Sequence, residues 1–127
     1  MIHTAESTRS LDEVCDALQE AVTKRQFGVM TVHNLRETMA KKGVEFGRNC
    51  RILEVCNPHQ AKRVLESQME ISTALPCRIS VYEEGDKVIL ATIKPSMMLQ
   101  MFGGEGLEDV AEDVERVMVD SMAEAAG

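Results

Sequence analysis

The chain contains no tryptophan, few other aromatic residues and no excess of basic residues. Aromatic residues make up 3% of its 127 residues, and 14 lysines and arginines stand against 21 aspartates and glutamates, for a formal net charge of −7. Single-stranded nucleic acids are bound by stacked aromatic side chains in basic grooves, and duplexes by basic surfaces. The composition therefore argues against nucleic acid as a partner.

Long apolar runs are also missing. A membrane-spanning helix needs roughly 20 consecutive, mostly apolar residues, and no stretch of this sequence comes near that length. The first residues, Met1–Glu6, have neither the basic region nor the apolar core of a secretory signal. An acidic surface repels anionic lipids. We therefore expect a cytoplasmic protein that does not bind membranes.

The cysteines are few and widely spaced, and no Cys-x-x-Cys pair occurs. They are Cys15, Cys50, Cys56 and Cys77. In a cytoplasmic chain of this length we expect reduced thiols and not a disulfide framework. Cys56, His59 and Cys77 could supply three soft ligands, but zinc would lack a fourth protein ligand. The sequence therefore predicts no metal site and no cofactor.

Helix starts are marked by capping signals. Ser10-Leu11-Asp12-Glu13 reads as a capping box that opens a helix from Leu11 to about Lys24, with Cys15 in its buried stripe. Asn34 and Asn57 cap two further helices, Leu35–Lys42 before Gly43 and Pro58 to about Ser67. A short helix begins at Pro95-Ser96, and a final one covers Leu107 to about Ala125. The methionines of the short helix, Met97, Met98 and Met101, are interpreted as core filler, with a thioether cluster for copper or an apolar binding surface as the alternatives.

Strands are indicated by β-branched and alternating residues. The expected strands are Ile2–Thr8, Phe27–Val32 with a bulge or close approach at Gly28, Cys50–Cys56, and a hairpin of Cys77–Glu83 and Lys87–Ile93 joined through Glu84-Gly85-Asp86. An irregular linker holds Ile71 and Leu75. The order β-α-β-α-β-α-β-β-α-α predicts one α+β domain over residues 1–127, with helices packed on one face of a mostly antiparallel sheet.

The last segment carries the whole net negative charge. Residues 103–127 hold eight acidic residues against Arg116 alone. Gly103-Gly104-Glu105-Gly106 is expected to be a hinge or loop, because it lacks the strand and lysine of a phosphate loop. The final helix has one apolar stripe, formed by Leu107, Val110, Ala111, Val114, Val117, Met118 and Met122. This stripe requires a surface to cover, either on the same domain or on a second subunit.

One junction has a chemical character of its own. Cys56 ends an apolar strand immediately before Asn57-Pro58, so it lies beside the positive end of a helix, where a solvent-accessible thiol is favoured as thiolate. Antiparallel pairing of this strand with the one that begins at Cys77 would bring the two sulfurs close. The pair is interpreted either as two small apolar side chains in a tight junction or as a functional thiol pair.

Three stretches of the sequence carry a resemblance to a known family: Cys56-Asn57-Pro58, Leu75-Pro76-Cys77 and Pro95–Met98. Over about residues 1–102 the chain resembles the bacterial and archaeal family called domain of unknown function 302. The resemblance implies an α+β domain with a curved antiparallel sheet and helices on one face, often seen as a homodimer. It implies no established activity. Cys56 and Cys77 are signature residues without assigned chemistry.

Two hypotheses follow. The first is a dimeric, non-catalytic binding or sensing module that uses an uncovered sheet face for a partner or small ligand, with Asn57, His59, Arg78 and Tyr82 as candidate binding residues. The second is a thiol-dependent redox or transfer enzyme with Cys56 as nucleophile and Cys77 as resolving partner. No Ser/His/Asp arrangement supports a hydrolase, and the paired carboxylates Glu83-Glu84 fall in a turn.

Overall fold

The computed structural model describes residues 1–103 and 105–127 and confirms the α+β class. Five antiparallel strands form one sheet in the order β1-β5-β4-β3-β2: β1 (Ile2–Ser7), β2 (Gly28–Asn34), β3 (Cys50–Cys56), β4 (Cys77–Glu84) and β5 (Lys87–Ile93). The helices are α1 (Leu11–Lys24), α2 (Leu35–Lys41), α3 (Pro58–Ser67), the 3₁₀ helix η1 (Met69–Ala74), α4 (Pro95–Gln100) and α5 (Glu108–Ala126).

The predicted capping signals are present. Glu13 N donates to the Ser10 hydroxyl and Ser10 N donates to the Glu13 carboxylate, which completes the capping box of α1. Asn34 caps α2 by accepting from Glu37 N at 3.1 Å, and α2 ends before Gly43, whose φ is +78°. Local chemistry thus determines where these helices begin and end.

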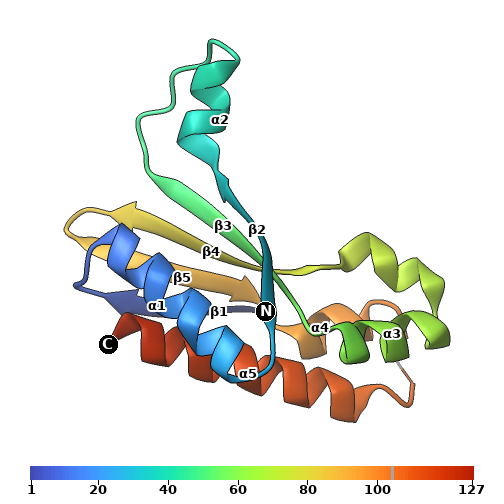
Figure 1. The fold of residues 1–127 in the computed structure, drawn as a ribbon. Helices are drawn as coiled ribbons and strands as arrows, with labels where there is room; N and C mark the ends of the chain where they lie inside the picture. The colour runs from blue at the N-terminus through green and yellow to red at the C-terminus, as the bar shows by residue number, and fades with distance from the viewer. Residues whose placement is uncertain (104) are drawn as a thin grey trace.

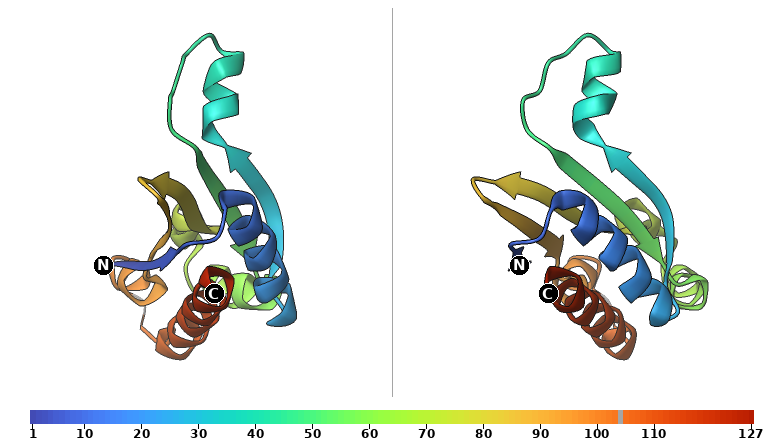
Figure 2. Two further views of the ribbon diagram at one scale, coloured as in Figure 1. Left: turned by 90° about the vertical axis from the view of Figure 1, so that its left-hand side faces the viewer. Right: turned by 60° about the vertical axis from the view of Figure 1, so that its left-hand side comes forward.

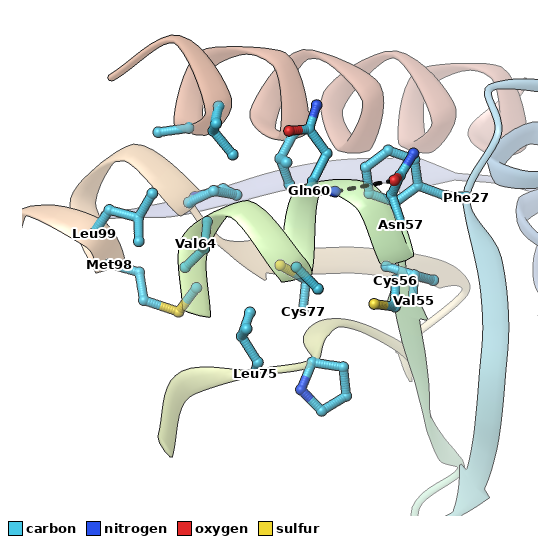
Figure 3. A pocket seen from close by; sticks show the side chains of 16 residues that line it. Phe27, Val55, Cys56, Asn57, Gln60, Val64, Leu75, Cys77, Met98 and Leu99 are labelled. Atoms are coloured by element: carbon cyan, nitrogen blue, oxygen red, sulfur yellow. Dashed lines mark hydrogen bonds between the residues drawn. The ribbon is translucent and has the colours of Figure 1, made fainter. Parts of the chain in front are cut away.

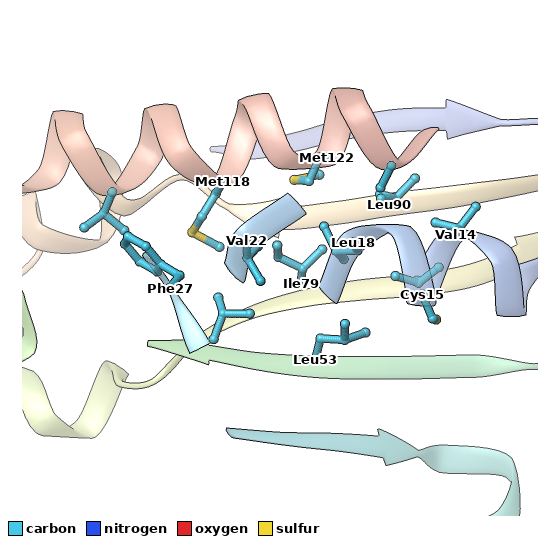
Figure 4. Close-up of a cluster of buried hydrophobic side chains, with 14 of the residues drawn as sticks. Val14, Cys15, Leu18, Val22, Phe27, Leu53, Ile79, Leu90, Met118 and Met122 are labelled. Carbon is cyan, nitrogen blue, oxygen red and sulfur yellow. The ribbon is translucent and has the colours of Figure 1, made fainter. Parts of the chain in front are cut away.

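The core lies between the sheet and two long helices, α1 and α5, which run side by side on one face (Figure 1). Leu53, Ile79 and Leu90 point from three adjacent strands toward Leu18 and Met122 on the helices (Figure 4). All five side chains have no exposed surface. Burial of apolar area at about 25 cal/mol per Å² makes this layer the main source of stability.

Helix α5 docks on its own domain. This is one of the two outcomes expected for its apolar stripe, the other being contact with a second subunit. Val117 is only half-buried at the edge of the stripe, whereas Ser121 and Ala125 extend the buried side toward the C-terminus. The Glu115 carboxylate of α5 accepts from the Ser96 amide and hydroxyl. The carboxylate therefore ties α5 to the first turn of α4.

The opposite face of the sheet has no layer of helices over it among the described residues (Figure 2). Because side chains alternate along a strand, this face receives Ile52 and Glu54 from β3, Arg78, Ser80 and Tyr82 from β4, and Ala91 from β5. We call it the open face. The prediction of helices on one face is therefore confirmed.

A second exposed feature is the arm, residues 30–50, in which β2 and β3 project beyond the sheet and carry α2 at their tip (Figures 1 and 2). No residue of α2 is buried. Met30, Val32 and Val44 are exposed. The arm thus presents apolar side chains that the other described residues leave exposed.

Two local expectations were wrong, and a third falls partly outside the described residues. Strand β2 runs to Asn34, and its register shift falls between Val29 and Thr31, so the bulge is at Met30 and not at Gly28. The linker after α3 contains a 3₁₀ helix in which Ile71 is buried, because an apolar side chain there fills the space beside α3. The hinge predicted at residues 103–106 includes Gly104, which lies outside the described residues.

The methionines around α4 are not core filler. Met101 is 74% exposed, and Met97 and Met98 are only half-buried. The short helix turns Pro95 and Leu99 toward the core instead, because a helix of six residues has room for only one narrow buried face.

Within residues 1–103 and 105–127, no helix combines the length and apolar character that crossing a membrane requires.

Candidate functional site

Asn57 organises the junction between β3 and α3. Its Oδ1 accepts from His59 N at 2.9 Å and from Gln60 N at 3.2 Å, and its Nδ2 donates to the Gln26 carbonyl at 3.2 Å. One side chain thus caps α3 and ties it to the connection between α1 and β2. Both polar atoms of the Asn57 side chain are thus engaged in bonds that stabilise the junction, and Cys56 is the residue immediately before it in the chain.

Cys56 and Cys77 line the same small apolar pocket, which we call the cysteine pocket (Figure 3). Cys77 lies opposite Val55 across the β3–β4 pair, so Cys56 is one residue further along the neighbouring strand. The other walls come mainly from α3, α4 and α5, and the free volume is about 40 Å³. The structure therefore brings the two predicted cysteines together, in a space that admits little more than a water molecule.

Burial dominates the acid–base behaviour of both thiols. It raises the pKa of Cys56, and it raises the pKa of Cys77 to about 11, with a further contribution from the neighbouring Cys56. Because a thiolate is poorly solvated among apolar side chains, this effect exceeds the attraction of the α3 N-terminus for negative charge. Burial therefore favours the protonated thiol at both cysteines, whereas the helix start was expected to favour thiolate only where solvent reaches Cys56.

His59 does not join the cysteines. Its ring is exposed on the first turn of α3, and it is not among the residues that line the cysteine pocket. In the described part of the chain, no group of three or more His, Cys, Asp or Glu side chains is arranged to hold a metal ion. The soft ligands considered from the sequence are therefore not assembled into one site.

Arg78 and Tyr82 both lie on the open face, but in different depressions. Arg78 borders a hollow of about 300 Å³, the Arg78 hollow, whose floor includes Ile52, Ser80 and Ala91. Tyr82 borders a second depression of about 320 Å³ at the base of the arm. Ser80 separates the two residues along β4. The open face thus offers two separate places where a ligand or partner could contact the sheet.

The sequence reasoning missed His33 as part of the open face. His33 Nε2 lies 2.5 Å from Glu54 Oε1, and the Glu54 side chain is 18% exposed. Glu54 is directly opposite Arg78 in the β3–β4 register, yet Arg78 forms no ion pair within the described residues. Only the register of β2, shifted at Met30, could have indicated this pair, because His33 and Glu54 are distant in sequence.

The whole sheet and its helices correspond to a known domain. A family model described as "Domain of unknown function DUF302" matches residues 3–125. The chain belongs to the DUF302 family. The match extends through α5, beyond the residues 1–102 over which the sequence signatures were placed. The acidic C-terminal helix is therefore part of the DUF302 domain.

A solved structure agrees with this DUF302 chain over nearly its full length. The crystal structure of an uncharacterized conserved DUF302 protein from Bacillus stearothermophilus is 29% identical, covers 98% of this chain and 97% of its own, and superposes with a TM-score of 0.91. No curated protein matches the chain. The family supplies the fold, so the function has to be argued from the open face, the arm and the cysteine pocket.

Proposed function

We propose that this DUF302 protein is a dimeric binding or sensing module without catalytic activity, which holds a small ligand or a partner on the open face of its sheet. The observation that carries the proposal is the Arg78 hollow. It places the Arg78 guanidinium, which has no ion-pair partner among the described residues, beside exposed apolar side chains, Ile2 at 54% and Ile93 at 48% exposure. A concave, mostly apolar surface with a few polar groups is the usual form of a ligand site.

The arm supports the dimeric part of the proposal. Its exposed apolar residues, Met30, Val32 and Val44, lie beside a helix with no buried residue. Residues 30–50 also carry four lysines and arginines against two glutamates, whereas α5 is strongly acidic. In a twofold dimer each basic arm could lie against the acidic surface of the other copy, which would cover the apolar residues and pair the opposite charges.

Native mass spectrometry and light scattering test this function. We expect the purified protein to be a dimer at micromolar concentration and to retain or take up a small molecule. Val32→Asp on the arm should convert the dimer to a folded monomer, because it places a charge in the proposed interface. Met101→Asp, an equally apolar-to-acidic change at a residue that is 74% exposed and far from the arm in sequence, is the matched control. A wild-type monomer at high micromolar concentration would contradict the dimer.

A thiol-dependent activity is the second candidate, favoured by the position of Cys56 and Cys77 in one pocket. Iodoacetamide labelling followed by peptide mass spectrometry separates the two functions. Because burial raises the pKa of both thiols, a binding module should show Cys56 reacting more slowly at neutral pH than a free thiol, whose pKa is about 8.5. Its rate should increase as the pH rises above that value, and Cys77 should react more slowly still. Rapid labelling of Cys56 at pH 7 would favour the enzyme.

A further inference from the structure

The charge of Arg78 is not neutralised by the acid that faces it. Glu54 is the cross-strand neighbour of Arg78, and opposite charges at such positions normally pair. The Glu54 carboxylate instead lies 2.5 Å from His33 on the other side, on β2. The hydrogen bond to His33 thus turns Glu54 away from Arg78 and leaves the guanidinium donors of Arg78 without a carboxylate partner among the residues that the structure describes.

The surroundings of Arg78 are mainly apolar. The Arg78 hollow is bounded by Ile2, Ile52, Ala91, Ile93 and Met98, which come from three strands and from α4. Two hydroxyl groups also line the hollow, those of Thr92 and Ser80. The Thr92 hydroxyl already donates to the Arg78 carbonyl at 2.7 Å. Ser80 remains on the floor as a small polar group. The hollow therefore combines one cation with an apolar wall.

We propose that the Arg78 hollow binds a small amphipathic carboxylate, with the carboxylate on the Arg78 guanidinium and an aliphatic tail along Ile52, Ala91 and Ile93. This inference rests on the proposed binding function and specifies its ligand class. A guanidinium presents two parallel N–H donors that match a carboxylate. The nearby Glu54 and the net charge of −7 disfavour multiply charged anions such as phosphate esters. The volume of about 300 Å³ suits a short chain.

His33 acts in this site as a positioning residue. Its hydrogen bond holds Glu54 away from Arg78, so the loss of His33 should release Glu54 to compete with the ligand for the guanidinium. His33→Ala should therefore weaken carboxylate binding although His33 does not line the hollow. Adding Glu54→Gln in the same chain removes the competing charge and should restore the affinity. A purely structural role of His33 would not be rescued in this way.

The test is a calorimetric titration of the full chain with octanoate, octanol and acetate. We expect saturable binding of octanoate, and much weaker binding of octanol, which lacks the charge, and of acetate, which lacks the tail. Arg78→Gln should weaken octanoate binding by about tenfold or more, since a charge-assisted bidentate contact is lost. Arg116→Gln on α5 changes the net charge equally, and its arginine pairs with Asp113 outside the hollow, so its affinity should stay within about twofold of wild type.

Two results would overturn the carboxylate assignment in different ways. If octanol binds as tightly as octanoate, and Ile52→Ser weakens both while Arg78→Gln weakens neither, the hollow takes apolar ligands without a charge. The carboxylate inference then fails and the proposed binding function stands. If neither octanoate nor octanol binds saturably to the wild-type protein, the carboxylate inference fails. If native mass spectrometry also finds no retained molecule and no partner, the small-ligand part of the proposed function fails with it.

Discussion

Replacing Ser121 by alanine should stabilise the protein. Ser121 lies on α5 with no exposed surface, and its hydroxyl has no hydrogen-bond partner within residues 1–103 and 105–127. Burying an unpaired hydroxyl costs about 1–3 kcal/mol, and alanine is the better helix former by about 0.5 kcal/mol. The space left by one oxygen atom costs part of this gain. We therefore expect Ser121→Ala to raise the free energy of unfolding by about 1–2 kcal/mol.

Ser7→Ala is the matched control, because Ser7 is also buried and its hydroxyl is fully used. The Ser7 hydroxyl donates to the Ala126 carbonyl at 2.8 Å and accepts from Arg9 N at 3.0 Å. The same chemical change there leaves two backbone groups without their partner, so it should lower the free energy of unfolding by about 1–2 kcal/mol. The two variants should thus move in opposite directions.

Urea and thermal unfolding followed by circular dichroism measure both effects. For a domain of this size, 1 kcal/mol corresponds to a change in Tm of about 4 °C. The m-values should stay equal, so that the shifts report stability and not a change in the unfolded state. The reasoning is refuted if Ser121→Ala lowers the free energy of unfolding by 1 kcal/mol or more while Ser7→Ala behaves as expected, because the Ser121 hydroxyl would then be satisfied in solution.

Three further predictions concern local structure, each with stability to urea as the readout. Asn57→Ala should cost about 1–2 kcal/mol, since it removes the cap of α3, whereas His59→Ala should stay within about 0.5 kcal/mol, because its ring is exposed; equal effects would contradict the capping role. Gly85→Ala in the β4–β5 turn, where φ is +63°, should cost about 1 kcal/mol, and Gly47→Ala, at a glycine with open space and no positive φ, should be neutral or slightly stabilising. Met122→Ala should cost about 2–5 kcal/mol, since the side chain has no exposed surface; a loss below 1 kcal/mol would mean that α5 does not pack as described.

Much of the fold could be predicted because its signals are local. The Ser10–Glu13 capping box and the Asn57-Pro58 helix start depend on side chains within four residues of the backbone groups that they bond. The alternation of Cys77–Glu83 places Ile79 and Val81 on the buried face without reference to any other segment. The end of α2 before Gly43, whose φ is positive, is likewise set by a local signal. These elements required only helix and strand periodicity.

The candidate site was only partly visible in the sequence. The proximity of Cys56 and Cys77 followed from strand pairing, and the pocket that both line agrees with it. The chemical state of the thiols did not follow, because it depends on how deeply α3, α4 and α5 bury the sulfurs. Arg78 was a candidate binding residue, but its lack of an ion-pair partner among the described residues could not be deduced from Glu54 being opposite it.

Taken by itself, the sequence determined the order of the strands and α-helices, the starts of the capped helices, the buried stripe of α5 and the face to which Arg78 belongs, because each depends on neighbours within one element. Only the tertiary structure decided which residues of different elements contact one another. The bulge at Met30 sets the β2 register and so brings His33 to Glu54. The docking of α5 buries the Ser121 hydroxyl and helps to close the cysteine pocket. Such contacts join residues 20 or more positions apart in the chain, and no periodicity within a single segment encodes them.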